Sequence, residues 1–96
     1  MTDPLIDDAL PGADLVRAGL SDLARGVESI PALLVAIGAH RLRRSGIELP
    51  ERLPDSPERR LYDRLAREDS DSAHSRYNAW IRRLVSYERA RECATR

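Results

Sequence analysis

The sequence contains no lysine and no phenylalanine, and only one cysteine. Its single cysteine, Cys93, excludes an internal disulfide and is typical of a reducing compartment. The longest apolar run, from Ile30 to Ala39, is about ten residues, whereas a membrane-spanning helix needs about 20. No basic start followed by an apolar run marks a signal peptide. We therefore expect a soluble, cytoplasmic protein.

The absence of phenylalanine leaves few large side chains for a core. The 96 residues include 22 Leu, Ile and Val side chains and one Trp. A domain of this length buries only roughly 60–65% of the surface that its unfolded chain exposes. These values allow one small globular domain that gains stability from a partner. They exclude a large catalytic fold with its own cofactor domain.

Because lysine is absent, all 16 basic residues are arginine, and 16 acids balance them to a net charge of zero. The charge is uneven along the chain. Residues 1–40 carry six acids and two arginines, a net of −4, and residues 41–96 carry ten acids and fourteen arginines, a net of +4. Arginine presents a planar donor fork that fits carboxylates and phosphates. This surface therefore suits ion pairs with a partner.

Apolar residues recur at three- and four-residue steps, which is the spacing of amphipathic helices. Together with capping residues, they predict an all-α fold, a small bundle of about four helices near 13–25, 30–45, 57–68 and 72–92. Pro50 and Pro54 indicate a proline-rich linker over 48–56, between two helical pairs. Residues 1–11 are expected to form a flexible acidic tail, and residues 12–94 a single helical domain.

The apolar stripes of the expected helices predict the core. Gly26 and Gly46 are expected to end helices, and Gly38 to kink or end the second one. The side chains that we expect to be most buried are Leu20, Leu23, Leu34, Ile37, Leu61, Leu65, Trp80, Ile81 and Leu84.

The sequence offers few groups for catalysis or metal binding. Its histidines, His40 and His74, and Cys93 lack the spacing of a zinc finger or an HExxH motif. Arg67 and His74 match the loose Arg–His spacing of HEPN-type RNases, but the acids between them would repel a phosphate. We expect no catalytic residue, no metal and no cofactor. An HEPN-like RNase is the remote alternative.

Basic residues cluster near the end of the second expected helix, at His40, Arg41, Arg43 and Arg44. Such a cluster can bind phosphate, although DNA-binding domains are more often clearly basic than neutral overall. A small DNA-binding regulator or accessory subunit is therefore the alternative function, with these four residues as its nucleic-acid contacts.

The last expected helix combines aromatic and arginine residues, a composition typical of protein-binding surfaces. We expect the partner-binding residues to be Arg76, Arg83, Tyr87 and Arg89, with Asp7 and Asp8 of the acidic tail as a second arm. The sequence thus favours a non-enzymatic protein-binding module that acts on a cognate partner.

Three segments carry a resemblance to a group of known proteins. They are Ser29 to Pro50 (SIPALLVAIGAHRLRRSGIELP), Pro57 to Tyr62 (PERRLY) and Ser75 to Leu84 (SRYNAWIRRL). From about residue 12 onward, the chain resembles small helical bacterial proteins encoded beside nucleotidyltransferase-type toxins. The resemblance implies an antitoxin that binds the toxin from its own operon and covers its active site or substrate groove. It transfers no functional residues.

Overall fold

The computed structural model describes residues 9–94, and this part of the chain is all-α, as the sequence predicts. The helices are α1 (Ala13–Ala24), α2 (Ile30–Ile37), α3 (Ala39–Arg44), α4 (Pro57–Glu68) and α5 (Ala73–Ala94). The acids Asp7 and Asp8, and most of the expected tail, lie outside the described residues. None of the helices within residues 9–94 has both the length and the apolar character needed to cross a membrane.

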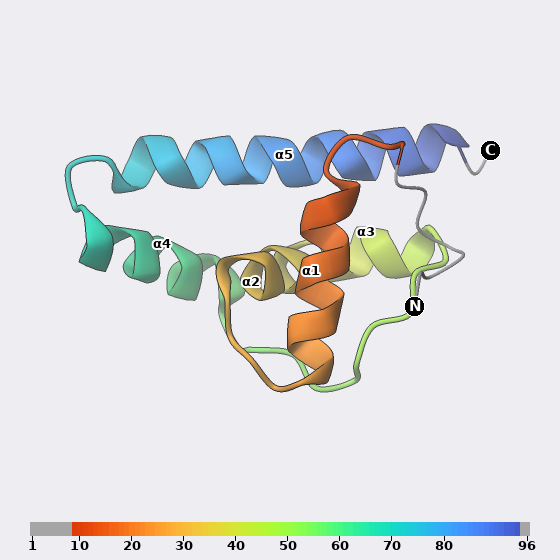
Figure 1. Cartoon of the computed structure of the whole chain (residues 1–96), viewed down its shortest axis with the longest axis horizontal. Helices are drawn as coiled ribbons and strands as arrows, with labels where there is room; N and C mark the ends of the chain where they lie inside the picture. The colour runs from red at the N-terminus through yellow and green to blue at the C-terminus, as the bar shows by residue number, and fades with distance from the viewer. Residues whose placement is uncertain (1–8, 95–96) are drawn as a thin grey trace.

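The longest helix, α5, organises the fold. Its 22 residues span about 33 Å, close to the 39 Å long axis of the molecule. In Figure 1, α4, α2 and α3 follow one another beneath α5, and α1 crosses this layer steeply. The N-terminal half of α5 therefore lies over α4, and its C-terminal half lies over α3.

Two glycines end helices as the sequence predicts. Gly26 and Gly46 have φ values of 71° and 97°, in the left-handed region. After α3, Ile47 N–H donates to Leu42 O and Gly46 N–H to Arg43 O, both at 3.0 Å, which is a Schellman motif. Ile47 and Leu42 are buried in one cluster and supply the apolar contact of this motif. The same bonding pattern follows α1, where Gly26 N–H donates to Leu23 O at 3.1 Å.

The predicted helix over 30–45 is divided at Gly38, which gives five helices instead of about four. The hydrogen-bond ladder continues through the division, because Gly38 N–H donates to Leu34 O and Leu42 N–H donates to Gly38 O. A Cβ at Gly38 would lie 2.9 Å from Glu88 Oε2 and 3.1 Å from Leu84 Cδ1. The glycine therefore lets α5 approach the chain closely at this kink.

The core consists of two clusters that share α5. The first contains Ala13, Val16, Val35, Leu42, Ile47 and Tyr87, and the second contains Leu15, Leu33, Leu34, Leu61, Leu65, Ala73 and Leu84. Of the expected core residues, four are buried: Leu34, Leu61, Leu65 and Leu84. The other five lie partly buried at the edges of the clusters: Leu20, Leu23, Ile37, Trp80 and Ile81.

Leu10 corrects the expected boundary of the tail. Leu10 lies within the expected tail segment 1–11, but it is partly buried and packs against the first cluster. Ala13 N–H donates to Leu10 O at 3.2 Å, which ties the residue to the start of α1. The ordered domain therefore includes at least Leu10.

Candidate functional site

One edge of α5 carries a tryptophan between two arginines. Arg76, Trp80 and Arg83 are spaced at i, i+4 and i+7, so they lie on one side of the helix. Trp80 is partly buried against the second cluster. The guanidinium carbon of Arg83 lies 5.3 Å from the centroid of the Trp80 ring, within cation–π range.

Both arginines pair with acids from other helices. Arg76 Nη2 lies 2.9 Å from Glu68 Oε2 at the end of α4, and Arg83 Nη2 lies 3.4 Å from Asp14 Oδ2 in the first turn of α1. All four side chains are more than one-third exposed, so each pair contributes only about 0–1 kcal/mol to stability. We call the surface formed by these five residues, Arg76, Trp80, Arg83, Glu68 and Asp14, the Trp80 face.

The expectation that Tyr87 lies on this surface is wrong. Tyr87 continues the row of Trp80 and Arg83, but its side chain is fully buried in the first cluster. The start of α1 covers it, since a Cβ at Gly12 would lie 3.1 Å from Tyr87 Cβ and 3.0 Å from Arg83 O. Tyr87 is a core residue and is not available to a partner.

The structure does not bring Arg89 together with Arg76 and Arg83. Arg89 is exposed, but six residues beyond Arg83 it points about 120° away around the helix, at 100° per residue. The acidic arm of the expected interface, Asp7 and Asp8, lies outside the described residues. The described part of the predicted site is therefore reduced to Arg76 and Arg83.

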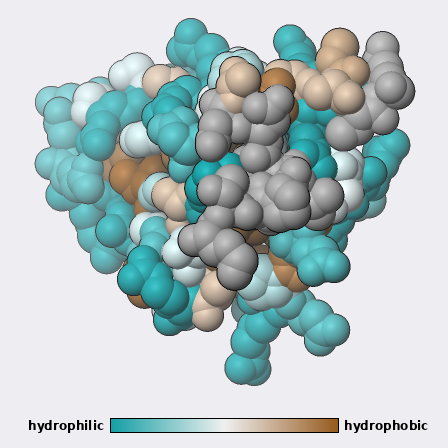
Figure 2. Space-filling view, turned by 45° about the vertical axis from the view of Figure 1, so that its right-hand side comes forward, coloured by the Kyte–Doolittle hydropathy of each residue, from teal (hydrophilic) through white to brown (hydrophobic). Residues whose placement is uncertain are grey.

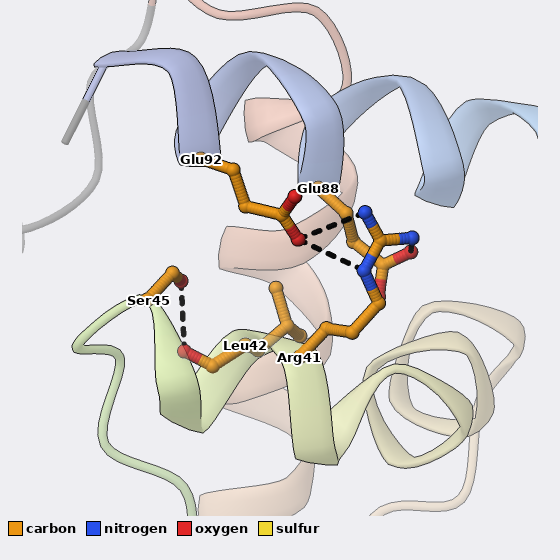
Figure 3. Close-up of polar contacts among 5 residues, drawn as sticks. All are labelled: Arg41, Leu42, Ser45, Glu88 and Glu92. Atoms are coloured by element: carbon orange, nitrogen blue, oxygen red, sulfur yellow. Dashed lines mark hydrogen bonds and ion pairs between the residues drawn. The ribbon is translucent and has the colours of Figure 1, made fainter. Parts of the chain in front are cut away.

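Some of the expected nucleic-acid contacts bond to other groups of the chain, and others are exposed to solvent. Arg41 Nη1 lies 3.1 Å from Glu88 Oε1, and Arg41 Nη2 lies 2.8 Å from Glu92 Oε1 (Figure 3). Arg43 donates to Pro50 O at 3.0 Å, whereas His40 and Arg44 are exposed. Two of the three guanidiniums thus hold the chain's own acceptors. Of the four residues, only Arg41 pairs with carboxylates, and His40, Arg43 and Arg44 lie exposed at the surface.

Glu88 is a buried acid in the contact between α3 and α5. Its side chain is 4% exposed, and Arg41 reaches it from α3. From the same helix as Glu88, Arg91 donates to Ser45 O at 3.0 Å. Burial raises the pKa of Glu88, with an opposing contribution from Arg41 and a smaller reinforcing one from Glu92. These bonds fasten the short helix α3 to the C-terminal turns of α5.

Replacing Glu88 with glutamine should change how stability depends on pH. Because its pKa is raised, Glu88 holds a proton more tightly in the folded chain than in the unfolded one. The stability linked to that proton is fully present below the ordinary pKa of 4.5 and is lost as pH rises through the folded pKa. Glutamine cannot titrate. The unfolding free energy of Glu88→Gln, relative to the wild type, should therefore rise between pH 4.5 and neutrality.

Urea denaturation at the two pH values measures this difference. Glu48→Gln, at an exposed position, is the matched control for the chemical change. A relative loss of stability of Glu88→Gln towards neutral pH would contradict the expectation, because it would mean that Arg41 outweighs burial.

The other residues considered for catalysis, His74, Arg67 and Cys93, lie on the surface. His74 Nε2 lies 3.2 Å from Asn78 Nδ2, one turn further along α5, and Arg67 is exposed near the end of α4. Cys93 is exposed as a free thiol. Within residues 9–94, no group of three or more His, Cys, Asp or Glu side chains can hold a metal ion.

A groove of about 540 Å³ lies between the end of α1 and the linker. The apolar part of its wall consists of Leu23, Ala24, Val27, Pro50, Leu53 and Pro54, and Val27 is 43% exposed. Sequence reasoning missed this groove, because the linker was treated as a spacer. The apolar residues Pro50, Leu53 and Pro54 within the linker were the available signal.

Comparison of the chain with protein-family models, with curated proteins and with solved structures gave no significant match in any of the three.

Proposed function

We propose that this chain is a non-enzymatic protein-binding module and that the Trp80 face is its contact surface. The observation that carries the proposal is the partly exposed side chain of Trp80 on the edge of α5, with Arg83 over its ring and Arg76 one turn before it. Tryptophan and arginine are the side chains that most often dominate the binding energy of protein interfaces.

The internal ion pairs of the Trp80 face are weak enough for a binding protein to replace them. The two ion pairs of Arg76 and Arg83 are exposed, so a partner can replace Glu68 or Asp14 at little cost. Figure 2 shows that hydrophobic residues occupy only small areas between hydrophilic ones on the side of the molecule it presents. A few anchoring side chains such as Trp80 can supply most of the binding energy of an interface of this kind.

The class of partner that we propose is a nucleotidyltransferase-type toxin encoded beside this chain, which the module neutralises as an antitoxin. The support is the resemblance of Ser29 to Pro50, Pro57 to Tyr62 and Ser75 to Leu84 to such proteins. A small helical domain can act by covering the toxin's active site or substrate groove, and this role requires no catalytic group of its own.

Co-expression with the product of the neighbouring gene tests the proposal. We expect the two proteins to co-purify and the chain to relieve growth arrest caused by the neighbour. Trp80→Leu keeps an apolar group against the second cluster but removes the indole. It should weaken binding by about 2 kcal/mol or more, roughly 30-fold, as expected of an anchoring residue.

The exposed Tyr62, 39% accessible on α4, provides an aromatic control. Tyr62→Ala should leave binding unchanged, and circular dichroism should confirm that both variants fold. If the two proteins do not co-purify and growth arrest persists, the proposed function is wrong. If binding survives Trp80→Leu unchanged, the module binds through another surface.

A further inference from the structure

A second row of arginines lies beside the Trp80 face. On α4, Arg60, Arg64 and Arg67 are spaced at i, i+4 and i+7, so they share one side of the helix. Glu68 follows Arg64 at i+4, and its ion pair with Arg76 joins this side of α4 to the Trp80 face. Figure 1 shows α4 lying directly below the N-terminal half of α5. We call Arg60, Arg64 and Arg67 the α4 arginine row.

The combined surface has more positive than negative groups. Its five arginines, Arg60, Arg64, Arg67, Arg76 and Arg83, share this surface with four carboxylates, those of Glu28, Asp14, Glu68 and Asp63. Arg60 Nη1 lies 3.0 Å from Glu28 Oε1, while Arg64 donates to the backbone oxygen of Glu28 at 2.8 Å. Among residues 9–94, no carboxylate pairs with Arg64 or Arg67. The small surplus of positive charge on this surface therefore comes from Arg64 and Arg67 on α4, because the two arginines beside Trp80 are each paired with an acid.

We infer that the Trp80 face and the α4 arginine row together bind an acidic segment of a partner protein, with carboxylates at its rim and an apolar side chain against Trp80. This inference rests on the proposed function, because it specifies the partner of the same site. Glu68 and Asp14 already show where carboxylates fit, at 2.9 Å from Arg76 and 3.4 Å from Arg83. The partner's acids take these positions and those beside Arg64 and Arg67.

The geometry favours an acidic protein over a nucleic acid. Single-stranded nucleic acids gain much of their affinity by stacking bases on aromatic rings. Here Arg83 lies over the Trp80 ring, so a base would have to displace the guanidinium before it could stack. A planar guanidinium also pairs well with a carboxylate while it remains stacked on an indole.

Two charge-reversal double variants of α5 test whether binding depends on this surface or on another side of the helix. Arg76→Glu/Arg83→Glu changes the Trp80 face. Arg82→Glu/Arg89→Glu makes the same change of charge at the same seven-residue spacing on another side of α5, where both side chains are exposed. The probe is a fluorescein-labelled helical peptide of leucine and glutamate, and its lysine-for-glutamate counterpart and a single-stranded RNA serve as competitors.

Fluorescence anisotropy with the full chain should show binding of the glutamate peptide that weakens as salt is added. Arg76→Glu/Arg83→Glu should weaken binding of the glutamate peptide by about 10-fold or more, because glutamates on α5 then face the glutamates of the peptide. Arg82→Glu/Arg89→Glu should change it by less than about threefold, because screening reduces the effect of charges beyond about 10 Å. Circular dichroism verifies that both variants fold.

Three results would overturn the inference: equal binding of the lysine peptide, equal loss in both double variants, or tighter binding of the RNA. The same variants in the co-expression assay separate the two proposals. If the neighbouring protein binds but tolerates Arg76→Glu/Arg83→Glu, the acidic-segment inference fails and the proposed function stands. If the glutamate peptide binds as expected but the neighbour does not co-purify, the proposed partner is wrong and the surface assignment stands.

Discussion

Replacing Gly19 with alanine is expected to destabilise the fold, although alanine is the better helix former by about 1 kcal/mol. A Cβ at Gly19 would lie 2.4 Å from Pro31 O and 2.4 Å from Val35 Cγ2. Because one of these contacts is with backbone, side-chain rotation alone cannot relieve the clash. Helices α1 and α2 would have to separate. Overpacking of this kind costs about 1–3 kcal/mol and sometimes more.

Thermal unfolding measures this effect, since a domain of this size loses roughly 4–8 °C in Tm for each kcal/mol. Ala18→Ser adds one atom at the neighbouring exposed position of α1 and should stay within about 0.5 kcal/mol of the wild type. If Gly19→Ala raised the Tm instead, α1 and α2 would not cross as closely as the structure shows.

Truncation of Tyr87 to alanine should have the largest effect of any single side-chain truncation in the described part of α5. The side chain is fully buried among residues of α1, α2, α3 and the start of the linker. Removal of a buried aromatic side chain costs about 3–5 kcal/mol. A small domain has only about 5–15 kcal/mol of stability in total, so a loss of this size should lower the Tm by roughly 12 °C or more.

Tyr62→Ala is the matched control, because it removes the same atoms from an exposed tyrosine. Tyr62 contacts Tyr77 with ring centroids 5.8 Å apart, and such a pair contributes about 0.5–1.5 kcal/mol. Urea denaturation of both variants gives the comparison. Equal losses at the two positions would show that Tyr87 is not the centre of the first cluster.

The contrast between Tyr87 and Trp80 shows how far the sequence could predict the site. Both lie on one row of α5, and helical periodicity predicts that row but not which part of it another helix covers. The N-terminal end of α1 covers Tyr87 and leaves Trp80 at an edge. The direction in which α1 crosses depends on contacts between distant residues. We therefore expected the wrong aromatic residue in the core.

Local features were predicted more accurately than distant pairings. The glycine stops at Gly26 and Gly46 depend only on neighbouring residues and were confirmed. The partners of Arg41 are 47 and 51 residues away in the sequence, and no pattern announces them. Of the basic cluster at His40 to Arg44, the sequence therefore could not show that Arg41 pairs with acids on α5, whereas the other three basic residues are exposed.

The sharing of α5 by both clusters has a consequence for folding during synthesis. Tyr87 completes the first cluster, and Leu84 and Ala73 complete the second. The helices that precede α5 therefore cannot close either cluster while the ribosome is still adding residues 73–91. At about 5–20 residues per second, their apolar faces remain exposed for roughly a second or more. A nascent chain of this kind is a target for chaperones and proteases until α5 is in place.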